Sequence, residues 1–170
     1  SDIDGGTLSV SGLTISAGNG TLVDNLDGTW SYTPAADDDS AVAFSYSISD
    51  GAGGSVAGSA TLDITPVNDA PTAVADTLFT SEDSALTIPA ITLLGNDTDI
   101  DGDTVTITSV QGAINGTVAL VGGNVVFTPA SNYSGPASFT YTVTDGNGGD
   151  STTSVNITVA PVNDAPTAIG

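Results

Sequence analysis

Apolar and polar residues alternate along several short stretches of the chain. The alternation is clear over residues 42–48, 105–107, 139–143 and 155–159. A period of two residues is typical of β-strands that bury one face. Turn-forming pairs separate these stretches: Asn19-Gly20, Asp27-Gly28, Asn115-Gly116 and Gly122-Gly123. Such pairs are typical of tight hairpins, so the pattern predicts an all-β fold of short strands.

The sequence also repeats itself. Residues 66–73 recur unchanged as residues 161–168, which is 95 positions later. The second copy is nearly whole, whereas the first begins where the second has Thr98 and lacks a counterpart of residues 71–97. We therefore predict three parts, described by their bounds: a partial repeat over 1–67, a complete repeat over 68–162, and a linker into a further repeat over 163–170.

Seven strands are predicted for the complete repeat, at about 73–80, 84–94, 104–110, 117–121, 124–128, 137–144 and 151–160. Seven short antiparallel strands in one repeat are typical of a Greek-key β-sandwich. The linker between repeats contains Pro66 and Pro71, which favour extended backbone. We expect tandem seven-stranded sandwiches arranged end to end, the first truncated at its N-terminus.

Five residue types are absent from the chain: Lys, Arg, His, Cys and Met. The 170 residues carry a formal net charge of −20. Without Lys or Arg, contacts to nucleic-acid phosphates are excluded, and an anionic membrane surface repels the chain. Without His or Cys, disulfides, thiolate or imidazole metal sites and Ser-His-Asp catalysis are excluded. Only a carboxylate pair could serve an enzyme, and the acids gather at domain ends, so we expect no enzymatic activity.

Strand order places three acidic segments at one end of the complete repeat. In a seven-stranded sandwich the entry linker, the loop after the second strand and the loop after the sixth strand meet at the same end. The residues expected there are Asn68, Asp69, Asp97, Asp99, Asp101, Asp103, Asp145 and Asn147. Carboxylates this close cannot all remain ionised without a cation.

The other acids fall at the remaining ends of the two repeats. At the opposite end of the complete repeat we expect Glu82, Asp83, Asn163 and Asp164. The remnant of the same acidic end in the truncated repeat consists of Asp2, Asp4 and Asp50. The run at residues 37–39 is equally compatible with a cation site and with a solvated loop.

Oxygen-only ligands indicate a hard cation. Six to eight flexible oxygens suit Ca²⁺, whereas Mg²⁺ requires stricter octahedral geometry. The spacing over residues 97–102 matches the first half of an EF-hand loop, but Thr108 stands where the bidentate Glu would be. We therefore predict a calcium site completed by other loops. Asp is also an ordinary turn former, which is the interpretation we favour for Asp24, Asp27, Asp63 and Asp76.

Three motifs of the chain resemble those of a known family. They are the Val-Asn-Asp-Ala-Pro linker, the Asp-x-Asp-Gly-Asp loop at 99–103 and the Thr-Asp-Gly-Asn-Gly-Gly loop at 144–149. Together they resemble the cadherin-like tandem repeats of bacterial giant surface adhesins, which are the extender modules of RTX-type and biofilm-associated adhesins. The resemblance covers essentially the whole chain. It implies secreted β-sandwich domains in which calcium at domain junctions stiffens a rod that projects a binding tip from the cell surface.

The resemblance also assigns individual residues. The residues that match its calcium motifs are Asn68, Asp69, Asp99, Asp101 and Asp145. Glu82 matches the Glu near the first strand, which points to the next junction. The chain departs from the family pattern in three ways: the first repeat lacks a counterpart of Glu82, no Arg is present for an Asp-Arg-Glu element, and no nonapeptide β-roll array is present.

We therefore predict a calcium-stiffened spacer of a bacterial cell-surface adhesin, used in adhesion or biofilm formation, whose partners are neighbouring repeats of the same chain. One alternative is a subunit of an extracellular filament or surface layer in which other copies supply strands. Another is a carbohydrate- or protein-binding module, which would need an exposed aromatic ring. Tyr133 is a better candidate for that ring than Trp30, which the alternation places in the core. No apolar run is long enough to cross a membrane, so we expect no insertion by this segment.

Overall fold

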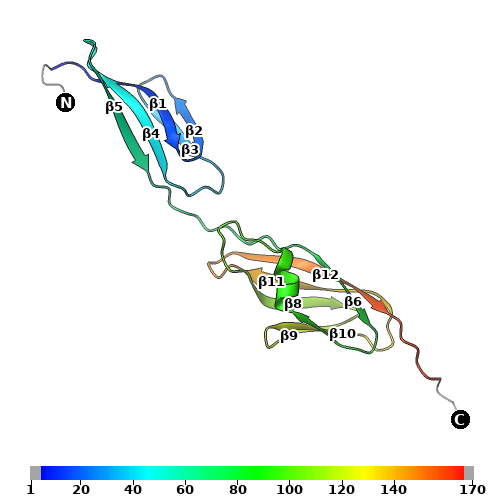
Figure 1. Cartoon of the computed structure of the whole chain (residues 1–170). Coiled ribbons are helices and arrows are strands. Elements are labelled where there is room, and N and C mark those ends of the chain that lie inside the picture. Colours follow the sequence, from blue (N-terminus) through cyan, green and yellow to red (C-terminus); the bar gives the residue numbers. More distant parts are fainter. Residues whose placement is uncertain (1–4, 167–170) are drawn as a thin grey trace. The chain divides into compact units, whose positions relative to one another are not determined.

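The chain folds into two units of short β-strands, Ser1–Val67 and Asn68–Gly170. The computed structural model describes residues 5–166. Figure 1 shows that each unit contains its own layered strands.

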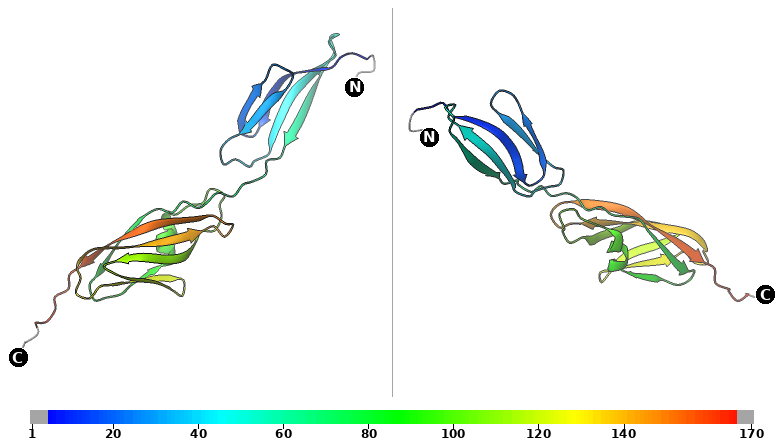
Figure 2. Two further views of the ribbon diagram at one scale, coloured as in Figure 1. Left: turned by 180° about the vertical axis from the view of Figure 1, so that it is seen from behind. Right: turned by 45° about the horizontal axis from the view of Figure 1, so that its top comes forward.

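The second unit is a sandwich of two sheets. One sheet has the strand order β6-β12-β11-β8 and the other has the order β7-β10-β9. The strands are β6 (Asp76–Ser81), β7 (Leu86–Pro89), β8 (Thr106–Ile114), β9 (Gly116–Val121), β10 (Asn124–Pro129), β11 (Gly135–Thr144) and β12 (Asp150–Ala160). Both views of Figure 2 show β11 and β12 side by side in one layer. The predicted all-β Greek-key sandwich is confirmed.

Alternating side chains of the longest strands build the core of this unit. Phe139, Tyr141 and Val143 on β11 are at most 1% exposed, and Val155 and Ile157 on β12 are at most 2% exposed. The ring of Phe139 stacks on that of Phe127 of the facing sheet, with centroids 6.0 Å apart. Burying one such side chain stabilises the fold by about 1.5–3 kcal/mol. The predicted period of two residues therefore marks the residues that join the two sheets.

A one-residue turn and a parallel strand pair define how the strands are arranged. A single residue, Asn115, separates β8 from β9 and takes a φ of 58°, which Asn tolerates better than most residues. At the other edge of the larger sheet, β6 pairs in parallel with β12, from Asp76 opposite Val155 to Ser81 opposite Ala160. All other strand pairs of the unit are antiparallel.

The strand predicted over 84–94 is shorter than expected. β7 ends at Pro89, and the chain continues as a short helix α1 (Ala90–Leu93) and a 3-10 turn η1 (Leu94–Asn96). Proline has no N–H to donate to a sheet and its fixed φ suits the start of a helix. Leu93 is fully buried while Ile91 is 79% exposed. A short apolar run does not distinguish a strand from a buried helical turn, which explains the error.

The first unit has fewer strands. They are β1 (Ser9–Ala17), β2 (Gly20–Asp24), β3 (Trp30–Pro34), β4 (Val42–Ser49) and β5 (Ser55–Leu62). β1, β4 and β5 form one sheet in the order β1-β4-β5, and β2 and β3 form a hairpin. Val42 and Phe44 are its buried apolar residues among those described. The ring of Tyr32 meets that of Phe44 edge to face at 5.4 Å.

Candidate metal centre

The loop between η1 and β8 gathers three carboxylates. Asp99, Asp101 and Asp103 each bring a carboxylate oxygen within 4.8 Å of the others. Asp99 organises the loop, because its Oδ1 accepts the backbone N–H of Asp101 at 2.9 Å and that of Asp103 at 3.3 Å. The backbone therefore holds together three groups that repel one another when ionised.

One oxygen of this cluster has no protein partner. Asp99 Oδ2 is buried and forms no hydrogen bond with the described residues. The whole sequence contains no Lys or Arg that could neutralise the cluster. A buried carboxylate oxygen without a donor costs folding free energy, and a bound cation removes that cost. Because the available ligands are oxygens, the site fits a hard cation such as Ca²⁺.

Two further segments of the second unit join this loop. The backbone N–H of Asp69 donates to Asp101 Oδ2 at 2.7 Å. The Asn147 amide, in the loop between β11 and β12, donates to Asp103 Oδ2 at 2.7 Å. The isolated bridge between Thr72 and Thr98 brings the entry segment alongside the acidic loop. The three segments that strand order predicted to meet are therefore connected by hydrogen bonds.

Asp145 fastens the third segment. Its carboxylate is 6% exposed and accepts the Asn68 amide at 2.7 Å and the backbone N–H groups of Asn147 at 2.7 Å and Gly149 at 3.0 Å. The bond from Asn68, followed by the backbone N–H groups of the loop, lowers the pKa of Asp145 against the opposing effect of desolvation. A Cβ on Gly149 would collide with this carboxylate and approach the Ala70 Cα to 2.6 Å. Only glycine allows the loop to close this tightly around Asp145.

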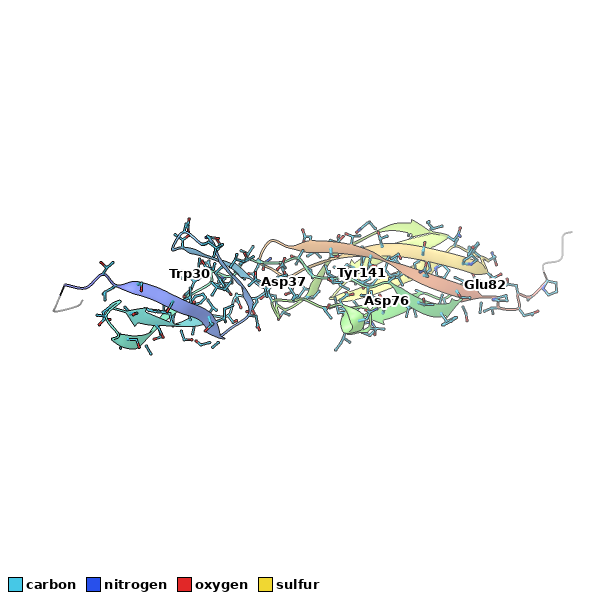
Figure 3. The ribbon with its side chains drawn as sticks, turned by 90° about the horizontal axis from the view of Figure 1, so that it is seen from above. Trp30, Asp37, Asp76, Glu82 and Tyr141 are labelled. Carbon is cyan, nitrogen blue, oxygen red and sulfur yellow. The ribbon has the colours of Figure 1, made fainter. Side chains whose placement is uncertain are left out.

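The Asp97 side chain lies outside the cluster of three carboxylates. Its Oδ1 accepts the backbone N–H of Val74 at 2.8 Å, and its Oδ2 lies 3.1 Å from the buried hydroxyl of Tyr141. The same hydroxyl lies 3.0 Å from Asp76 Oδ2 and 3.2 Å from the Leu93 carbonyl (Figure 3). Burial raises the pKa of Asp76, the Tyr141 hydrogen bond opposes the shift, and the charge of Asp97 adds to it. Asp97 thus anchors the start of the acidic loop to the core, and Asp76 is more than a turn former.

The acids of the opposite end have separate partners. Glu82 is 7% exposed, and its Oε1 accepts the backbone N–H of Val162 at 2.7 Å (Figure 3). Asp83 Oδ1 accepts the backbone N–H of Asn132 at 3.1 Å. The Asn163 amide contacts the carbonyl of Asp164 at 3.4 Å. Glu82 therefore ties the exit segment to the unit, while a metal site formed by Glu82, Asp83, Asn163 and Asp164 stays a prediction.

In the first unit, Asp50 repeats the arrangement of Asp145. Its Oδ1 accepts the backbone N–H groups of Ala52 at 2.8 Å and Gly54 at 2.9 Å. The bond from Ala52 lowers the pKa of Asp50, with desolvation opposing it. Asp38 turns towards Asn19, whose amide it accepts at 2.7 Å. The two remaining candidates of this unit, Asp2 and Asp4, lie outside the described residues.

The aromatic candidates for a binding platform are partly enclosed. Tyr133 is half-buried, and its hydroxyl donates to the Pro136 carbonyl at 2.7 Å. Trp30 is also half-buried. Phe79, on the outward side of β6, is 72% exposed. The sequence did not single it out because Leu78 beside it is equally apolar and only the fold decides which side faces the core.

No helix among residues 5–166 has the length and apolar character needed to cross a membrane.

Comparisons with known proteins agree with this architecture. The sequence profile of the family described as "Cadherin-like domain" matches residues 1–65 and 67–160. No curated protein matches the chain. Among solved structures, human mucin-like protocadherin EC1-2 is 18% identical with a TM-score of 0.50, over 91% of this chain and 85% of that one. This likeness shows the same fold.

Two other similar structures are larger. The human desmocollin-1 ectodomain is 10% identical with a TM-score of 0.49, over 93% of this chain and 34% of that one. An endo-fucoidan hydrolase from glycoside hydrolase family 107 is 25% identical with a TM-score of 0.36, over 94% of this chain. The present chain spans about a quarter (24%) of the hydrolase.

Proposed function

The chain belongs to the cadherin-like domain family, and on that basis we propose that it is a calcium-stiffened spacer of a bacterial cell-surface adhesin. Cadherin-like domains are extracellular and generally bind calcium. The observation that carries the proposal is the buried, unpartnered oxygen of Asp99 inside a cluster of three carboxylates. In a chain without basic residues, a cation from solution is the available neutralising charge.

The residues that would hold calcium are Asp99, Asp101 and Asp103. A bound calcium ion would supply positive charge that offsets the repulsion among the three carboxylates. Asn68 and Asp69 link the start of the second unit to this site by hydrogen bonds. The backbone N–H of Asp69 donates to Asp101 in the acidic loop, and the Asn68 amide donates to Asp145. These two residues directly follow the first unit, so fixing them limits the backbone freedom of the chain where it enters the second unit.

Stiffening is a direct consequence of this linkage. Without calcium, repulsion within the cluster loosens the acidic loop and with it the hydrogen bond from Asp69. With calcium, the loop and the entry segment are held together, since the ion binds the assembled loops and not the open ones. We propose that neighbouring repeats of the same chain are the partners, that the function is mechanical rather than enzymatic, and that the protein serves adhesion or biofilm formation.

Binding and stiffening are tested by separate measurements. Thermal unfolding in excess chelator, then with calcium or magnesium added, measures binding to the second unit. The chain has no Cys, so Thr33→Cys and Thr117→Cys place one spin label on each unit for a distance measurement. We expect calcium, and not magnesium, to raise the unfolding midpoint and to narrow the distance distribution.

Variants assign these effects to the site. Replacing Asp99 and Asp101 together by Asn should abolish both calcium effects while the two units stay folded. Asp150→Asn, which removes one exposed charge outside the cluster, is the matched control and should retain both. A rise in midpoint with an unchanged distance distribution would support calcium binding and reject the spacer mechanism. No calcium effect on either measurement would reject both.

A further inference from the structure

The sequence contains three Asn-Gly pairs, which are Asn19-Gly20, Asn115-Gly116 and Asn147-Gly148. A glycine after an asparagine leaves its backbone nitrogen unshielded, because glycine has no side chain. That nitrogen can attack the carbon of the asparagine amide, and the asparagine is then converted into an acid. Since the local sequence is the same in all three pairs, the fold decides which of them can react.

Strand ladders fix the first two pairs. Gly20 begins β2 and Gly116 begins β9, and both strands are paired from these residues onwards. A Cβ on Gly20 would approach the Thr33 carbonyl oxygen to 2.6 Å, and one on Gly116 would approach the Thr128 carbonyl oxygen to 2.5 Å. The Asn115 amide also makes two hydrogen bonds within the unit, of 2.8 and 3.0 Å. Ring closure at either pair would require a strand end to leave its ladder.

The third pair lies in the loop between β11 and β12. Asn147 and Gly148 are both exposed and belong to no strand. A Cβ on Gly148 would meet nothing within 4 Å, so the backbone has room to rotate. The Asn147 amide is held by Asp103 Oδ2 at 2.7 Å. Asp145 restrains the Gly148 nitrogen weakly, because the pKa of that carboxyl is lowered first by the bond from Asn68 and least by the Gly148 N–H. This pair can therefore react without opening a strand ladder.

We propose that Asn147 is a site of spontaneous deamidation in the folded protein, and that the reaction adds a carboxylate beside the acidic loop. The Gly148 nitrogen loses its proton to water and forms a bond to Asn147 Cγ, while the bond from Cγ to the side-chain nitrogen breaks and ammonia leaves. Water then opens the cyclic imide. Opening at one carbonyl gives aspartate, and opening at the other gives isoaspartate, in which the backbone runs through Cγ. In sum, an amide and a water become a carboxylate and an ammonium ion.

The new carboxylate would face Asp103. Before the reaction, an N–H of Asn147 donates to Asp103 Oδ2. After it, an anionic oxygen replaces the donor, and the hydrogen bond becomes a contact between like charges. The position adds a carboxylate to the cluster of three in a chain that has no Lys or Arg. Age would therefore weaken the contact between the two loops irreversibly. The proposal rests on the hydrogen bonds and exposure of the described residues and not on calcium.

Peptide mapping after ageing measures the reaction at each pair. The whole chain is incubated at mildly alkaline pH in excess chelator, below its unfolding midpoint, and a parallel sample is kept unfolded in urea. Trypsin finds no site in a chain without Lys or Arg, but cleavage after aromatic residues puts the three pairs on different peptides, because Trp30 and Phe127 lie between them. Mass spectrometry then measures the exchange of amide for carboxyl, and chromatography separates the aspartate and isoaspartate products.

The folded and unfolded samples should differ in which pair reacts. In the folded sample we expect Asn147 to be converted about tenfold faster or more than Asn19 and Asn115. In the unfolded sample the three pairs should react at similar rates. Asn147→Gln keeps an amide but lengthens the side chain, which disfavours ring closure, and it should abolish conversion at this position. A rate at Asn147 no higher than at the other two pairs of the folded sample would overturn the proposal.

The effect of the added charge is tested by substitution. Asn147→Asp reproduces one product with an unchanged backbone and should lower the unfolding midpoint in chelator, because it faces Asp103. Asn156→Asp adds the same charge at an exposed position of β12, outside the acidic loops, and should stay closer to the wild type. If both variants lower the midpoint equally, repulsion with Asp103 is not what the reaction adds, and that part of the proposal is overturned.

Discussion

Asp99→Asn should change the stability of the second unit in opposite directions with and without calcium. The Asn side chain keeps the shape of Asp, and its Oδ1 must still accept the N–H groups of Asp101 and Asp103. Its amide nitrogen is therefore forced into the buried position where Asp99 Oδ2 has no partner. There the substitution replaces a charged oxygen by a neutral N–H donor. In chelator the substitution removes one of three clustered charges and stabilises the unit, whereas in calcium it removes a charged ligand.

The sizes of the two effects follow from general magnitudes. An unsatisfied buried polar group costs about 1–3 kcal/mol, so we expect the variant to gain about 1 kcal/mol in chelator. For a domain of this size that is a rise of about 4–8 °C in the unfolding midpoint. Extracellular calcium modules bind in the range of about 0.1–1 mM. A tenfold to hundredfold excess of calcium then stabilises the wild-type unit by about 1.4–2.7 kcal/mol, most of which the variant should lose.

The assay is thermal unfolding followed by far-ultraviolet circular dichroism, in chelator and in a calcium series, for the wild type, Asp99→Asn and Asp150→Asn. The wild type should have the lower unfolding midpoint of the two in chelator and the higher midpoint in calcium. Asp150→Asn should follow the wild type, because its carboxylate lies outside the cluster. If Asp99→Asn is less stable than the wild type in chelator, or gains as much as the wild type from calcium, the assignment of the unpartnered oxygen to a cation site is wrong.

Three further predictions concern the second unit. Tyr141→Phe removes the buried hydroxyl that the half-buried carboxylates of Asp76 and Asp97 share, and it should lower the unfolding free energy in chelator by about 1–3 kcal/mol, measured by urea unfolding. A change below about 0.5 kcal/mol would contradict the network. Because burial raises the pKa of Asp76, the folded unit binds that proton more tightly than the unfolded chain, and this stabilisation is present at low pH and lost as pH rises through the raised pKa. Asp76→Asn should therefore gain stability relative to the wild type as pH rises from about 3 to 7 in urea titrations, and a constant difference would contradict the pKa shift. Gly149→Ala should lower the unfolding midpoint and weaken the response to calcium, because the added Cβ collides with the Asp145 carboxylate. The control is Gly95→Ala, where nothing lies within 4 Å of the added Cβ, and it should leave the midpoint and the calcium response unchanged.

The strands were predictable because their signals are local. Alternation along β11 and β12 is a property of consecutive residues. The pair Asn115-Gly116 indicates the turn between β8 and β9 by its backbone preference alone. The helical turn after Pro89 was missed because an apolar run is compatible with a strand and with a helix, and only packing of Leu93 into the core decides between them.

The candidate site was predictable at the level of loops and not of side chains. Strand order alone brings together the segments that contain Asp69, Asp101 and Asp145, since each strand reverses the chain direction. The direction of each carboxylate depends on contacts between residues far apart in sequence. Asp97 turns to the core hydroxyl of Tyr141, although its spacing from its neighbours suggested a ligand. No local pattern contains that information.

The parallel pairing of β6 with β12 has a consequence for how the second unit bears load. The two strands lie at opposite ends of the unit's sequence and point the same way, so tension applied through the chain pulls the start of one strand and the finish of the other apart lengthwise. The hydrogen bonds between Asp76–Ser81 and Val155–Ala160 are then sheared together and share the force, whereas in an antiparallel hairpin pulled from its open end they break one after another. A repeat whose first and last strands pair in parallel resists extension through these two strands before any of its inner strands is loaded.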